Sequence, residues 1–239
     1  MNIRLLPFQL PFTLPPTELL IIESLFLLVV FICCAVIFYR TYSVFQLTEH
    51  KGIKYFRSIF LHFGLAYFFR LVHFFLLGLR DFTNIPAPEI LLNINLFFVS
   101  YFSTMALFSL FMTILYKFKK IDSHVPHVTI HVVSVLFAVF FAVTNSLISL
   151  VIFQTLLIIL CVLLFPIAYL RGSRKGLFNQ NNITYLLLIV FWALSLVAFS
   201  GRLIPFVGKV IFYIFSAAIF LWITQRVTRR LSFNGKKTR

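Results

Sequence analysis

The sequence predicts an all-α membrane protein, a bundle of seven transmembrane helices with the amino terminus outside and the carboxyl terminus in the cytoplasm. Hydrophobic residues make up 61% of the chain and charged residues only 11%, whereas about a quarter of the residues in a soluble protein are charged. The mean hydropathy of +1.02 agrees with this contrast. Seven apolar runs are separated by short polar segments, and the basic residues gather in alternate segments.

The net charge of +15 would favour nucleic acid as the partner of a soluble protein. Here the basic residues lie between the apolar runs and at the carboxyl end of the chain. In that position they indicate orientation, because Lys and Arg accumulate in the cytoplasmic loops of membrane proteins. No nucleic-acid partner is therefore predicted.

The apolar runs define the expected spans. A helix needs about 20 residues to cross a hydrocarbon core of about 30 Å. The chain is expected to form a single polytopic membrane domain over 1–239 that ends in a basic cytoplasmic tail over 228–239. The predicted spans are 17–39, 58–79, 89–117, 128–145, 147–170, 183–200 and 206–227.

The first three spans have recognisable features. Pro15 and Pro16 precede the first span and favour a helix start, while Glu18 suits the positive end of the helix dipole. The second span carries the polar residues considered below. The third is longer than a core of about 30 Å requires at about 1.5 Å per residue, so it is expected to tilt or to project from the bilayer.

The remaining spans follow closely on one another. The fourth is marginal in length, and a short segment leads from it into the fifth. Pro166, near the end of the fifth span, predicts a kink or the end of the helix. The sixth follows a polar loop, and the tight turn GRLIP at 201–205 separates it from the seventh.

The distribution of basic residues predicts the orientation. With the amino terminus outside, most of the 21 Lys and Arg residues fall in the first, third and fifth loops and in the tail, as the positive-inside rule requires. We expect a multi-pass protein of the cell membrane whose basic loops and tail contact anionic lipids of the inner leaflet. The same basic surface could also meet a cytoplasmic partner protein.

Three ionisable residues interrupt the second span. At helical spacing Ser58, His62, Ala66, Arg70 and His73 follow one another by three or four residues, so they are expected to form one stripe along the helix. Most other residues of this span suit a lipid environment.

Arg70 is the most informative of these residues because it should lie near mid-membrane, where inserting an arginine costs about 2.5–3.5 kcal/mol on insertion scales. Glu23 lies well inside the first span, so we expect the two charges to approach each other. Glu89 and Asn93 in the outer part of the third span are expected to complete the network. The interpretations left open are a ligand site for an anionic group, a proton relay and a structural ion pair.

The predicted ligand-binding or ion-pair site therefore consists of residues that share polarity and a place inside an apolar span: Arg70, Glu23, His73, His62, Glu89 and Asn93.

A second cluster of histidines precedes and enters the fourth span in the sequence DSHVPHVTIH. His127 and His131 are four residues apart, a spacing used by metal ligands, and His124 lies just before them. Pro126 is expected to leave His124 off the helix, and no glutamate separates the pair as in a zinc hydrolase. Histidines at a membrane interface are the favoured interpretation, and no metal site is predicted. No catalytic residue and no cofactor is predicted.

Three classes of function remain open. A sensor or receptor-like protein would bind a small or lipidic ligand in the outer half of the bundle. A transporter would use the same stripe, continued inward by His62, as a path for a small anion or a proton-coupled solute. A metal-dependent membrane hydrolase would need the histidine cluster. Gly64 and Pro166 are the only glycine and proline that lie more than a few residues from a span end. Since many transporters use helices that are broken at mid-membrane, this scarcity favours the sensor-like interpretation.

Overall fold

The computed structural model describes residues 17–48, 51–83, 89–116, 125–144, 147–172, 180–199 and 205–236. Within these ranges the protein is all-helical, as predicted. The helices are α1 (Thr17–Thr48), α2 (Lys51–Thr83), α3 (Glu89–Tyr116), α4 (Val125–Thr144), α5 (Leu147–Gly172), α6 (Gln180–Phe199) and α7 (Phe206–Lys236).

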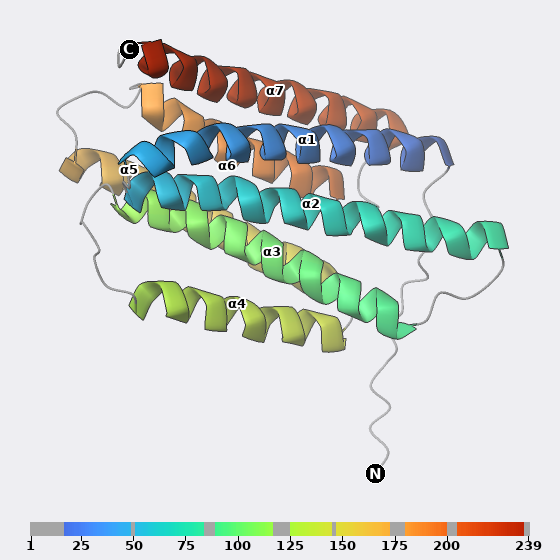
Figure 1. The fold of residues 1–239 in the computed structure, drawn as a ribbon. Coiled ribbons are helices and arrows are strands. Elements are labelled where there is room, and N and C mark those ends of the chain that lie inside the picture. Colours follow the sequence, from blue (N-terminus) through green and yellow to red (C-terminus); the bar gives the residue numbers. More distant parts are fainter. Residues whose placement is uncertain are drawn as a thin grey trace.

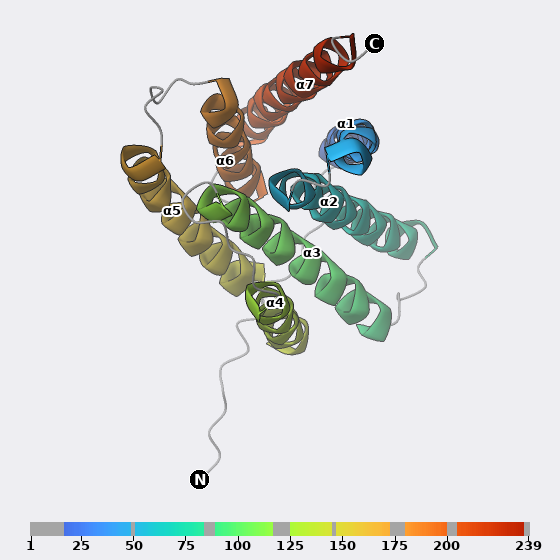
Figure 2. The same cartoon turned by 60° about the vertical axis from the view of Figure 1, so that its left-hand side comes forward.

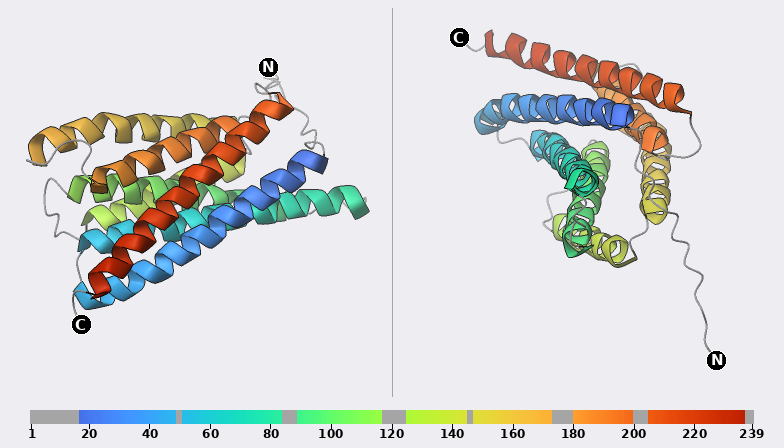
Figure 3. Two further views of the ribbon diagram at one scale, coloured as in Figure 1. Left: turned by 90° about the horizontal axis from the view of Figure 1, so that it is seen from above. Right: turned by 90° about the vertical axis from the view of Figure 1, so that its right-hand side faces the viewer.

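Consecutive helices run in alternating directions along one common axis (Figure 1). Each helix packs against the next one along the chain, and α1 also packs against α7, which closes the bundle into a ring. Figure 2 and the end-on view in Figure 3 show this arrangement, with α1, α2, α3 and α4 following one another around one side. Helix α3 also contacts α5. Helices far apart in the sequence are therefore brought together mainly at the α1–α7 contact.

Five helices are long and apolar enough to cross a membrane, and their candidate spans lie in α1, α2, α3, α5 and α7. The apolar parts of α4 and α6 are shorter, over Val128–Thr144 and Ile183–Ala198. Large apolar side chains are exposed on several helices, for example Leu25, Val143, Leu163 and Ile214. Apolar surface of this extent suits lipid rather than water, so the chain is a membrane-like helical protein.

Several helices extend beyond the spans expected from hydropathy. Helix α1 continues to Thr48, α2 begins at Lys51, and α7 continues to Lys236 through most of the basic tail. The physical reason is that polar residues end a hydrophobic run without ending a helix, because backbone hydrogen bonds form equally well in the interfacial region. Pro166 also lies inside α5, which continues to Gly172.

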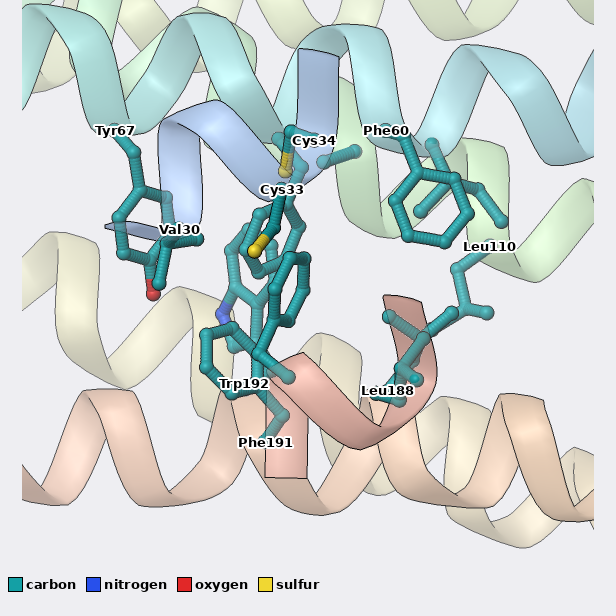
Figure 4. Close-up of a cluster of buried hydrophobic side chains, with 14 of the residues drawn as sticks. Val30, Cys33, Cys34, Phe60, Tyr67, Leu110, Leu188, Phe191 and Trp192 are labelled. Atoms are coloured by element: carbon teal, nitrogen blue, oxygen red, sulfur yellow. The ribbon is translucent and has the colours of Figure 1, made fainter. Parts of the chain in front are cut away.

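The centre of the bundle is filled mainly by aromatic side chains. Phe63 on α2 packs with Trp192 of α6 and Phe220 of α7, at ring-centroid distances of 4.4 and 5.7 Å. Figure 4 shows part of this core, in which Cys33 and Cys34 of α1 lie among the rings. Helices α1 and α2 approach closely at Gly64, because a Cβ atom there would lie 3.0 Å from the Cβ of Cys34.

Candidate functional site

The structure brings together Arg70 of α2 and Glu23 of α1, the pair that the sequence analysis expected. Nη2 of Arg70 donates a hydrogen bond to Oε1 of Glu23 at 2.5 Å. The two side chains are only 14% and 7% exposed. Both charges are thus largely withdrawn from solvent, and each supplies the counter-charge that the other needs.

Two tyrosines extend this ion pair toward the other side of the ring. Tyr213 of α7 is buried and lies within electrostatic reach of the Glu23 carboxylate. Tyr67, one turn before Arg70, donates a hydrogen bond of 3.0 Å to the hydroxyl of Ser195 on α6. We call Glu23, Tyr67, Arg70 and Tyr213, together with His73, the Arg70 site. It joins α1, α2 and α7, and it reaches α6 through Tyr67.

His73 lies one turn beyond Arg70 on α2 and within the electrostatic influence of its guanidinium. Its Nδ1 atom is buried and has no hydrogen-bond partner among the residues that the structure describes. A buried polar atom normally has a partner, since leaving it without one costs about 1–3 kcal/mol. This nitrogen therefore has a hydrogen-bonding capacity that no described residue uses.

Glu89 and Asn93 of α3, which were expected to complete the network, make no contact with Arg70 that the structure describes. The side chain of Glu89 lies outside the described part of the chain, and Asn93 is half-buried. Asn95, which the sequence analysis did not single out, is buried instead, and its Nδ2 has no hydrogen-bond partner within the described ranges. An isolated amide in an apolar run was the available signal, but the sequence does not reveal which of two neighbouring asparagines faces inward.

His62 belongs to a different cluster from Arg70. Its Nδ1 lies 2.8 Å from the backbone oxygen of Ser58 and 3.5 Å from Oγ of Ser109 on α3. On α4, the ring of His131 lies 6.5 Å from the His62 ring, and its Nδ1 is 2.8 Å from the hydroxyl of Tyr101. We call Ser58, His62, Tyr101, Ser109 and His131 the His62 cluster.

The expected single stripe on α2 is therefore divided between two sides of the helix. Residues four apart on a straight α-helix are offset by about 40° around its axis, so three such steps rotate the side chain by about 120°. Ser58 and His62 face α3 and α4, whereas Arg70 faces α1 and α7. The stripe is continuous in sequence, but it contacts different neighbours at its two ends.

The three histidines that are candidate metal ligands are placed only in part. His124 and the side chain of His127 lie outside the described residues, and His131 belongs to the His62 cluster. Among the side chains that are described, no group of three or more His, Cys, Asp or Glu residues could hold a metal ion.

A further buried polar contact links α3 to α5 and was not anticipated. Nε2 of Gln154 donates a hydrogen bond of 2.6 Å to Oγ of Ser103, and that hydroxyl donates to the backbone oxygen of Ser100 at 3.1 Å. Gln154 is an amide inside an apolar run, which is the signal that could have identified it. Because its donor is satisfied within the protein, this contact fixes the packing of α3 against α5.

Comparison with known proteins places this chain beside one relative of similar length. An uncharacterised protein from Archaeoglobus fulgidus is 26% identical to it over 232 residues, which cover 94% of this chain and 99% of the relative. No family model matches the chain, and no solved structure matches it. The similarity extends along nearly the whole of both chains, and the uncharacterised relative assigns no function to this one.

Proposed function

We propose that this chain is a sensor or receptor-like protein of the cell membrane that binds a small or lipidic ligand with an anionic group at the Arg70 site. The observation that carries the proposal is the buried Nδ1 of His73, which has no described hydrogen-bond partner. This atom lies one turn from the buried guanidinium of Arg70. Ionisable groups inside a membrane bundle usually mark ligand or ion sites. A carboxylate or phosphate can accept hydrogen bonds from Arg70 in the same way as Glu23 does.

The location of the site supports a signalling role. Glu23 belongs to α1 and Tyr213 to α7, and these two helices pack together to close the ring. A ligand that competes with Glu23 for Arg70 changes the contacts between α1, α2 and α7 at the level of the Arg70 site. Such a change can alter the packing of these helices along their length, so it reaches the opposite end of the bundle. No step of this mechanism requires catalysis.

An aromatic stack next to the site favours sensing over transport. Phe69 of α2 lies 4.7 Å from Phe98 and 5.5 Å from Phe102, measured between ring centroids. The ring of Phe102 also stacks on His62 at 6.2 Å. These rings occupy the α2–α3 interface between the levels of His73 and His62, where a transport path would need polar groups.

The orientation follows from charge. In Figure 1 the carboxyl ends of α1 and α7 lie at the same end of the bundle as the start of α2. Arg40, Lys54, Arg57, Arg226 and Arg229 belong to these segments. We place this end in the cytoplasm, where it meets anionic lipids and a partner protein, and the amino terminus outside.

The proposal is tested by thermal unfolding of the purified full chain in detergent micelles, with succinate, glycerol 3-phosphate and decanoate as probes. We expect at least one of these anions to raise the unfolding midpoint of the wild type, and the rise to disappear in His73→Phe. His62→Phe is the matched control, since it removes a histidine from the same helix outside the Arg70 site. No rise in the wild type, or an equal rise in His73→Phe, would contradict ligand binding at this site.

Transport of a small anion or proton-coupled solute is the alternative. It is supported by the polar His62 cluster in the opposite half of α2. The stabilising probe, radiolabelled and supplied to proteoliposomes, distinguishes the two. Uptake that depends on Arg70 would replace the sensor proposal with transport, whereas binding without uptake supports sensing.

A further inference from the structure

A second arginine of α2, Arg57, lies in a cage of aromatic rings from α1. Its guanidinium carbon is 4.9 Å from the ring centroid of Phe38, 5.0 Å from that of Tyr42 and 5.1 Å from that of Phe45. The three rings are four and three residues apart, so they share one face of α1 near its carboxyl end. Figure 1 shows this end of α1 beside the start of α2. The cage therefore positions the guanidinium firmly between the two helices.

Arg57 differs from Arg70 in having no counter-charge among the residues that the structure describes. Its Nη1 atom is buried and has no hydrogen-bond partner in the described part of the chain, and no carboxylate described there forms an ion pair with it. Cation–π contacts stabilise the charge of a guanidinium, but they leave its N–H donors without hydrogen-bond acceptors. A positioned arginine with a donor that has no described partner suits an anion from outside the protein.

The surroundings of Arg57 indicate which anion this is. Tyr39 and Tyr42 are 73% and 41% exposed, and Val36 is exposed on the same helix. Exposed tyrosines beside apolar side chains are typical of the boundary between hydrocarbon and headgroups. Lys54 and Arg40 are also exposed nearby in the sequence, which adds positive charge at this end of the bundle.

We infer that Arg57 is the anchor of a phospholipid site, in which the headgroup phosphate binds the guanidinium and the acyl chains lie along the exposed apolar side chains of α1. Arginine matches phosphate through two parallel hydrogen bonds, which a lysine cannot form. A lipid supplies both the phosphate and the apolar chains, whereas a soluble phosphate supplies only the first. With the orientation proposed above, this site lies in the cytoplasmic leaflet. It is independent of the Arg70 site and of whatever binds there.

The test is a titration of the purified full chain with phosphatidylglycerol in detergent, read by native mass spectrometry. We expect Arg57→Gln to weaken the tightest lipid adduct about tenfold or more, because it removes charge-assisted hydrogen bonds. Arg57→Lys is expected to give a smaller loss, since it retains the charge without the planar fork. Lys54→Gln removes an exposed charge from the same turns of α2 and should change the affinity less than threefold.

Further measurements distinguish a phosphate carried by a lipid from a free phosphate compound. If glycerol 3-phosphate binds as tightly as the lipid and is equally sensitive to Arg57→Gln, the site takes a free phosphate and the lipid assignment is overturned. Equal lipid affinity for the wild type and Arg57→Gln would also overturn it, as would displacement of the lipid by an acidic peptide at low concentration. Should Arg57→Gln not fold, the wild type decides the question: phosphatidylglycerol must raise its unfolding midpoint, and diacylglycerol, which has no phosphate, must not.

Discussion

Glu23→Gln is the most direct test of the Arg70 site, because it preserves the shape of the side chain and removes its charge. The substitution leaves the Arg70 guanidinium, which is only 14% exposed, without its counter-charge. Breaking a buried ion pair by removing one partner costs about 3–5 kcal/mol. We expect the lower end of this range, about 3 kcal/mol, because the amide oxygen of glutamine can still accept a hydrogen bond from Arg70.

The double variant Glu23→Gln/Arg70→Gln sharpens this prediction. Removing both charges abolishes the uncompensated cation, and replacing a whole buried pair is often close to neutral. The double variant is therefore expected to regain most of the lost stability, so that its loss is smaller than the sum of the two single losses by at least about 3 kcal/mol, which is the coupling energy between the two side chains. The sign of this coupling distinguishes an ion pair from two independently packed residues.

The assay is reversible unfolding of each variant in mixed micelles with increasing sodium dodecyl sulfate, followed by far-ultraviolet circular dichroism. Glu18→Gln is the control, because Glu18 is an exposed glutamate on the same helix; its effect should stay within about 0.5 kcal/mol. The reasoning is refuted if Glu23→Gln is as mild as Glu18→Gln. It is also refuted if the double variant loses the sum of the two single effects.

Two further predictions use the same unfolding assay. Gly64→Ala should destabilise the bundle by about 1–3 kcal/mol, because the new Cβ would lie 3.0 Å from that of Cys34. In the control Gly78→Ala the new Cβ meets nothing within 4 Å, so this variant should be neutral or stabilising by up to about 1 kcal/mol. Equal effects of the two substitutions would contradict the close approach of α1 and α2. Tyr101→Phe removes the 2.8 Å hydrogen bond to Nδ1 of His131 and should cost about 0.6–1.7 kcal/mol, as interhelical hydrogen bonds in membranes do; a stabilised variant would show that this bond does not hold α3 to α4.

The pairing of Glu23 with Arg70 could be predicted from the sequence for a simple physical reason. An arginine well inside an apolar run needs an acid, and Glu23 is deeply placed in the preceding span. The two helices are also adjacent in the chain, and adjacent helices with a short connection pack side by side. Composition and proximity in sequence therefore sufficed for this contact.

The partners of His62 could not be predicted from the sequence in the same way. Its neighbours Ser109 and His131 belong to α3 and α4, and they face it only because α2 presents different sides to its neighbours along its length. A stripe drawn at intervals of four residues hides this rotation of about 40° per step. Tyr213 shows the same limitation, since α7 reaches Glu23 only through the closure of the ring between α1 and α7.

By itself the sequence determined an all-helical, membrane-like chain, because backbone groups in hydrocarbon must form their hydrogen bonds within each segment. It also determined that buried charges had to be paired. Only the tertiary structure decided that Tyr213 joins the Arg70 site, that His62 meets His131, and that Arg57 lies against three aromatic rings. These contacts depend on the order of helices around the ring and on the rotation of each helix about its axis, which a hydropathy pattern does not encode.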